Sequence, residues 1–193
     1  MPSKKKPFWD IEENKGFTRV GPFNMDNKHV FYKVRNDFTT GSMEAAYRIY
    51  QSDKFLKSIK KFLQINSWHP DINDEVLIFL KTPHKIQEIP SNATFKGINK
   101  PKNVKKHQGA AWVGPDKEQR ASWRLIMLSI RKRNGSLKEW KDTQDLLIHE
   151  IAHTLANHVN YRHDDHKSDF KKSEKYLKGI ANHPSFIKIF NEN

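Results

Sequence analysis

The spacing of apolar residues predicts a helix over residues 42–63. Its apolar side chains recur at intervals of three and four, which is the period of one helical face, and they are Phe55, Leu56, Ile59, Phe62 and Leu63. Lysines occupy most of the intervening positions and point elsewhere. The polar segment 51–53 is a point at which this region could divide into two helices.

A second region of helical period lies near the end of the chain. Phe170, Ser173, Leu177 and Ile180 repeat at intervals of three and four and predict a helix that closes near Pro184. A short segment, residues 185–190, follows this helix.

Three shorter apolar runs predict strands. Residues 29–34 and 75–81 are compact runs, and the second is ended by a proline. Residues 122–131 are apolar on both faces, which is typical of a strand buried on one side and partly covered on the other. Residues 82–120, between these runs, are rich in turn residues and basic residues, and a loop of this length is usually functional or contains short strands of its own.

These elements together predict an α+β fold with a small mixed sheet. At 193 residues the chain is long enough for a core and is expected to be one domain. We expect residues 41–193 to form this domain and residues 1–40 to be an N-terminal extension packed on the core.

The positive net charge of the chain bears on which partners it is expected to bind. Lys and Arg number 35 against 22 Asp and Glu, a formal net charge of +13, which favours polyanions such as nucleic acid. Phe95 and Trp112 lie in the basic region and could stack on bases, although aromatic residues in such a stretch more often pin a loop to the core. Solubility alone would also account for the charge. If the chain binds DNA, we expect that binding to be non-specific.

The chain has no cysteine, which excludes disulfides and thiolate metal sites and leaves His, Asp and Glu as ligands. It has no apolar run approaching 18 residues and no apolar leader after the first basic residues. These features predict a soluble intracellular protein, without distinguishing the cytoplasm from the nucleus.

The strongest chemical signal is the motif HExxH formed by His149, Glu150 and His153. Two histidines four residues apart lie on one face of a helix, so both imidazoles can reach one zinc ion. Glu150 lies about 100° round the helix from His149, where it can act as a general base on a water activated by the metal. This arrangement predicts peptide hydrolysis.

The surrounding residues are compatible with a helix that carries this motif. Asp142 or Thr143 can cap its N-terminus, and its buried face consists of Leu147, Ile148, Ile151 and Leu155. The alternative is that the motif arose by chance and that the two histidines are ordinary, partly buried side chains without a metal.

Several residues compete to be the third metal ligand. His166 opens the last predicted helix, and Phe170 one turn later can anchor that helix in the core. Glu174 is the main alternative, because a downstream helical Glu can complete a His-His-Glu set. The connecting loop offers three further candidates, His163, Asp164 and Asp165. The simpler role for these residues is to hydrogen-bond to a metal ligand or to cap a helix. His158 would face away from the metal if the helix continued.

The segments 124–131, 142–153 and 166–170 resemble the WLM metallopeptidases and the SprT-like group, which pair HExxH with a later HxxxF. The resemblance covers residues 122–180. It implies a zincin-like fold, a zinc endopeptidase with Glu150 as catalytic residue, and His149, His153 and His166 as ligands. Some members of both groups cleave proteins crosslinked to DNA, so the resemblance also implies DNA-associated proteins as substrates.

Two classes of function therefore stand side by side. The first is a zinc metalloendopeptidase that binds an extended protein or peptide substrate along the edge of the strand at residues 122–131. The second is a basic nucleic-acid-binding module whose metal site is structural or inactive. An open position for water beside the metal favours the enzyme, and a fourth protein ligand favours the module.

Overall fold

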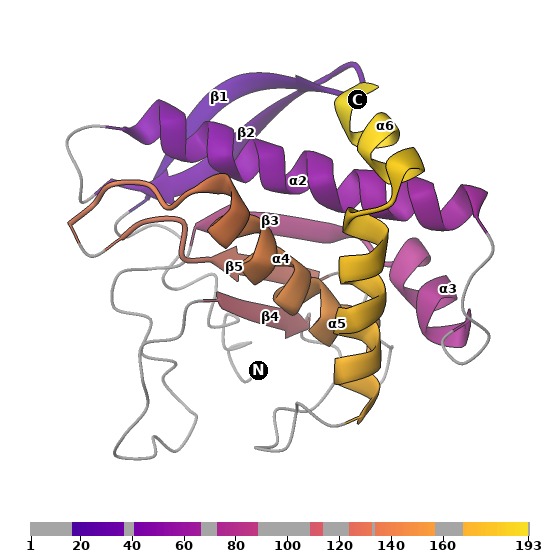
Figure 1. The fold of residues 1–193 in the computed structure, drawn as a ribbon. Coiled ribbons are helices and arrows are strands. Elements are labelled where there is room, and N and C mark those ends of the chain that lie inside the picture. The colour runs from indigo at the N-terminus through magenta and orange to yellow at the C-terminus, as the bar shows by residue number, and fades with distance from the viewer. Residues whose placement is uncertain are drawn as a thin grey trace, which may run out of the picture.

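The computed structural model has mixed α and β structure (Figure 1). It describes residues 17–36, 41–66, 73–88, 109–113, 124–132, 134–156 and 168–192. Within them, no helix is both long and apolar enough to span a membrane.

A three-stranded mixed sheet forms the centre, as predicted for the fold class. Its strands are β3 (His84–Glu88), β4 (Gly109–Val113) and β5 (Arg124–Leu128), in the order β3-β5-β4. β3 runs parallel to β5 and β4 runs antiparallel to it. The strand prediction for residues 122–131 is confirmed, and β3 and β4 lie within residues 82–120, for which a functional loop or short strands had been expected. The helices α2 (Ser42–Ile65) and α4 (Trp140–Leu155) pack on one face of this sheet (Figure 1).

A separate two-stranded hairpin precedes α2. Its strands, β1 (Phe17–Met25) and β2 (Lys28–Arg35), are antiparallel, and they pack against α2 (Figure 1). The prediction of a strand at residues 29–34 is confirmed, whereas β1 was not predicted. Met25, Tyr32 and Val34 belong to the hydrophobic core, so the hairpin shares the core of the rest of the chain.

The helix predicted over residues 42–63 is confirmed as α2, but it does not divide at residues 51–53. Ser52 is buried and its hydroxyl donates a hydrogen bond to the carbonyl of Arg48 at 2.9 Å. Asp53 accepts a hydrogen bond from the Tyr32 hydroxyl at 2.8 Å. The polar residues therefore have partners without a break in the helix.

The strand predicted over residues 75–81 is wrong, because this segment is the helix α3 (Asn73–Lys81). Val76 and Phe79, three residues apart, are buried, while Leu77 is 39% exposed, and this pattern is helical. Lys60 on α2 donates hydrogen bonds to the carbonyls of Leu80 and Thr82, at 3.4 and 2.6 Å, where the helix ends. Tertiary packing therefore decides between the two structures for this short apolar run.

The C-terminal helix is confirmed as α5 (Ser168–Ala181), with the predicted positions Phe170, Ser173, Leu177 and Ile180 all buried. The short segment after it is the helix α6 (Pro184–Glu192). Phe186 on α6 is buried, and its ring lies 5.1 Å from that of Phe55 on α2. The packing of α6 on α2 thus connects the end of the chain to the core.

Glu88 on β3 and Arg131, just after β5, form a buried ion pair. Arg131 Nε lies 2.9 Å from Glu88 Oε1, and the side chains are 3% and 1% exposed. The other carboxylate oxygen accepts a hydrogen bond from the backbone N–H of Arg35, and Arg131 also donates to the carbonyls of Gly41 and Gly135. Burial raises the pKa of the Glu88 carboxyl, and the hydrogen bond from Arg35 and the charge of Arg131 oppose this rise. The pair therefore joins three parts of the chain that are distant in sequence, namely residues 35–41, β3 and the segment after β5.

We expect Arg131→Met to lower the free energy of unfolding by about 3–5 kcal/mol, because Glu88 is then buried without its counter-ion. Adding Glu88→Gln should recover most of this loss, since no buried charge remains. Urea denaturation measures both effects. As a control, Lys188→Met removes an exposed lysine 3.9 Å from Glu192 and should cost less than about 1 kcal/mol. An equally small cost for Arg131→Met would contradict the role of the buried pair.

Candidate metal centre

The helix that carries HExxH is α4, and it begins earlier than the sequence predicted. Its first residue is Trp140, and its N-cap position is Glu139, so the assignment of Asp142 or Thr143 as N-cap is wrong. Thr143 is instead buried within the first turn, where its hydroxyl donates to the carbonyl of Glu139 at 3.2 Å and accepts from Arg48 at 3.4 Å. These contacts attach the start of the helix to α2.

The two histidines are the only partly exposed residues in the second half of α4. From residue 147 to residue 155, every residue except His149 and His153 is buried. Their rings lie 5.0 Å apart between centroids, with an angle of 84° between the ring planes. The sequence thus places two imidazoles side by side on the only partly exposed strip of residues 147–155 of this helix.

Glu150 is buried, with 4% of its surface exposed. Burial of a carboxylate costs solvation free energy, and glutamate is seldom fully buried in a helix that has only a structural role. A buried carboxylate next to two partly exposed imidazoles is typical of a site that performs proton transfer.

The helix α5 supplies the other wall of the site. The ring of Phe170 lies 4.9 Å from that of His149 and 4.5 Å from that of His153, so it holds both imidazoles in place. Glu174, one turn further along α5, has its Oε1 atom 3.5 Å from Nδ1 of His149. The same oxygen lies 3.3 Å from Nζ of Lys178.

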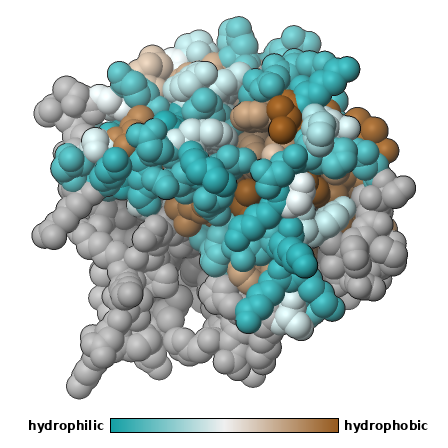
Figure 2. All heavy atoms as spheres, viewed as in Figure 1, coloured by the Kyte–Doolittle hydropathy of each residue, from teal (hydrophilic) through white to brown (hydrophobic). Residues whose placement is uncertain are grey.

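A cleft of about 1040 Å³ opens beside His149 and Glu174, between α4, α5 and the segment before α4. Its charged lining residues are Lys132, Lys138, Lys141, Lys178, Asp142, Asp145 and Glu174. Hydrophilic residues dominate this face of the molecule, and hydrophobic patches lie among them (Figure 2). The cleft lysines were not recognised from the sequence, where Lys132, Lys138 and Lys141 lie just before or at the start of α4 and Lys178 lies on α5.

The remaining candidate ligands lie outside the described residues, and they are His158, His163, Asp164, Asp165 and His166. His166 therefore stays a prediction. Among the residues that the structure describes, no three His, Asp or Glu side chains converge closely enough to hold a metal ion. The structure thus places His149 beside both His153 and Glu174, without a complete ligand set among the described residues.

The donors present fit zinc as far as their chemistry goes. Zinc accepts imidazole nitrogen and carboxylate oxygen ligands, and two histidines four residues apart are a common half of such a site. A carboxylate near Nδ1 of a metal-binding histidine leaves Nε2 for the ion and fixes the orientation of the ring. Glu174 stands in this position relative to His149.

No family model, curated protein or solved structure matches this chain. The assignment of the site therefore rests on its residues and their geometry.

The substrate position predicted along the strand at residues 122–131 is wrong. β5 is the central strand, with β3 on one side and β4 on the other, so its backbone groups are already paired. Within the described part of the sheet, β4 has β5 on one side only, and it also contacts α4. An added strand would therefore have to pair with β4.

Proposed function

We propose that the chain is a zinc-dependent endopeptidase with a zincin-like fold. The observation that carries this proposal is that α4 is buried from residue 147 to residue 155 except at His149 and His153. A helix built only for packing has no need of two histidines at its single opening with a buried glutamate between them. The arrangement is that of a metal-dependent hydrolase.

Each residue has a distinct role in this proposal. His149 and His153 bind zinc, and His166 supplies the third ligand. Phe170 packs on both histidine rings and limits their rotation. Glu174 orients the ring of His149 through Nδ1. The ammonium group of Lys178 also pairs with the Glu174 carboxylate.

Glu150 is the catalytic base. A bound zinc ion supplies a Lewis acid that polarises the scissile carbonyl and lowers the pKa of water to about 7. The carboxylate of Glu150 accepts the proton of the attacking water and afterwards delivers it to the leaving amine. Its burial keeps bulk solvent from competing for that proton.

An extended polypeptide is the substrate that this site fits. Its main chain would pair with the outer edge of β4, which contacts α4, and its side chains would enter the cleft beside His149 and Glu174. The net charge of +13 supports DNA-associated or DNA-crosslinked proteins as substrates, because such proteins lie within a polyanionic environment.

Removal of the metal tests this function. We expect chelation to abolish cleavage of casein or histone, and one equivalent of zinc to restore it, because in the proposed mechanism the metal activates the attacking water. Histone cleavage should also be measured with and without DNA. Undiminished cleavage by the metal-free protein, or no cleavage of any protein by the zinc-loaded one, would overturn the proposal.

A further inference from the structure

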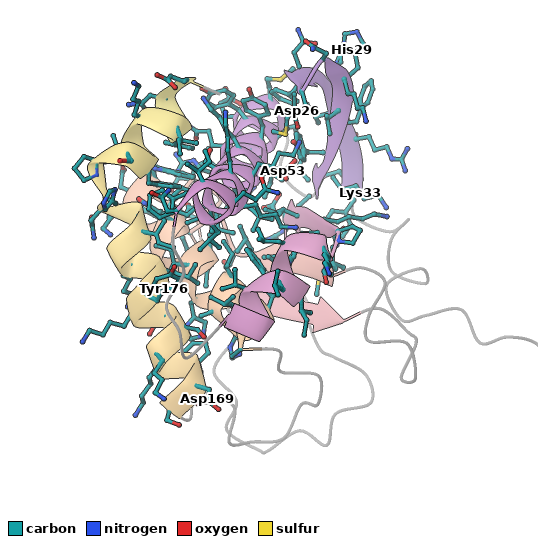
Figure 3. All side chains as sticks on the ribbon, turned by 90° about the vertical axis from the view of Figure 1, so that its right-hand side faces the viewer. Asp26, His29, Lys33, Asp53, Asp169 and Tyr176 are labelled. Atoms are coloured by element: carbon teal, nitrogen blue, oxygen red, sulfur yellow. The ribbon has the colours of Figure 1, made fainter. Side chains whose placement is uncertain are left out.

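We propose that the outer face of the β1–β2 hairpin binds single-stranded DNA, with Phe31 stacking on a base and the basic residues around it contacting phosphates. This face lies on the side of the hairpin away from α2. Figure 3 shows Asp53 on the side of α2 that faces the hairpin, and His29 and Lys33 on the hairpin away from that helix.

The alternation of the strands separates two faces. Tyr32 and Val34 point inward and are buried, whereas His29 and Phe31 are exposed and Lys33 is half-buried. The register places exposed Arg19 of β1 directly opposite Lys33 of β2. The outer face therefore carries one aromatic ring with cations on adjacent positions.

Charge complementarity points to a polyanion. On the outer face the two strands carry Arg19 and Lys33, and neither strand contains an acidic residue. Asp26, in the turn between the strands, is engaged by Lys57 of α2 at 2.7 Å. A phosphate placed between Arg19 and Lys33 would contact both cations.

Phe31 is 54% exposed although it lies in the middle of a strand. It lies opposite an irregularity in β1 that contains Gly21, at a φ of 154°. A Cβ on Gly21 would lie 2.7 Å from the carbonyl oxygen of Val30 and 3.0 Å from Cδ1 of Phe31. The absence of a side chain on Gly21 thus lets the Phe31 ring lie close to the backbone of β1 and present its outer face to solvent.

Contacts of the inner face attach the β1–β2 hairpin to α2. The Tyr32 hydroxyl donates to Asp53 at 2.8 Å, and the Phe23 ring stacks on that of Tyr50 of α2 at 5.3 Å. A fixed ring surrounded by cations is the arrangement by which proteins bind unpaired bases, because a base can stack and its phosphates find positive charge.

The same chemistry disfavours other partners. A second copy of a chain with a net charge of +13 would bring two cationic faces together. Single-stranded RNA offers the same bases and phosphates, so an RNA oligonucleotide is compared directly in the test. Duplex DNA keeps its bases stacked and cannot use Phe31.

Fluorescence anisotropy with a labelled oligothymidine of about 16 nucleotides tests the proposal on the full chain. We expect Phe31→Leu to weaken binding by about 5- to 150-fold, since it keeps the apolar contact but removes the stacking surface. Phe31→Trp should bind normally, with its fluorescence quenched by the base. Arg19→Gln with Lys33→Gln should lower the slope of log affinity against log salt by about 1.4.

The matched control is Lys171→Gln with Lys172→Gln, which removes two exposed lysines from α5. It should weaken binding much less than the Arg19 and Lys33 pair. Equal losses in both double variants, normal binding by Phe31→Leu, or tighter binding of duplex DNA or of an RNA of the same sequence would overturn the proposal. Binding does not depend on proteolysis, so Glu150→Gln should bind the oligonucleotide as the unmodified chain does.

Discussion

Replacement of Glu150 by glutamine is expected to lower kcat/KM for peptide hydrolysis by about 10²- to 10⁴-fold. Glutamine has nearly the same shape as glutamate but cannot accept the proton of the attacking water. His149 and His153 are retained, so zinc content should be unchanged. Cleavage of a fluorogenic peptide, together with metal analysis of the purified variant, measures both effects.

The control for this variant is Glu139→Gln at the start of the same helix. Glu139 is exposed at the N-cap position, so the substitution removes the same charge without touching the site. It should leave activity within about twofold of the unmodified chain. Residual activity above about a tenth in Glu150→Gln would refute proton transfer by Glu150.

The long helices were predictable because their apolar residues repeat over several turns. α2 and α5 each bury the residues that the period selects, among them Phe55 and Leu177. α3 was mistaken for a strand because seven apolar and charged residues are too few for the period to decide. Its identity depends on Val76 and Phe79 packing in the core, which is a tertiary effect.

The strand β1 and the positions of β3 and β4 were not predicted, and β3 shows one reason. β3 buries Ile86 together with Glu88, and the burial of Glu88 depends on Arg131, which lies 43 residues later. Such a pair leaves no local apolar pattern, since one strand position that should be apolar carries a charge. Strand order is also absent from local patterns, which is why β5 was taken for an edge strand.

The residues of the site also differ in whether local spacing or tertiary packing determines their positions. HExxH fixes the relative positions of His149, Glu150 and His153 within one helix, so these could be recognised from spacing alone. Phe170 was expected to anchor α5 in the core and is buried, whereas its packing on both histidine rings was not predicted. The approach of Glu174 to His149 depends on how two helices meet, and the sequence could only offer it as one of several alternatives.

Replacement of the third metal ligand is expected to have a large effect on zinc content. If His166 binds zinc, His166→Ala should lose nearly all bound metal after gel filtration, because two histidines alone make an incomplete site. Glu174→Gln should keep most of its zinc, with an affinity about 10- to 100-fold lower, as expected for a residue that orients a ligand. His29→Ala, which removes an exposed histidine from the hairpin, should retain the full amount.

The contacts of Glu174 are the reason for this order. Its Oε1 atom lies 3.5 Å from Nδ1 of His149 and 3.3 Å from Nζ of Lys178, so it is already shared between two nitrogen atoms. A ligand role would therefore fall to Oε2, unless Oε1 gave up one of these contacts. Loss of zinc in Glu174→Gln with retention in His166→Ala would assign Glu174 as the third ligand, and retention in both would direct the search to His163, Asp164 and Asp165.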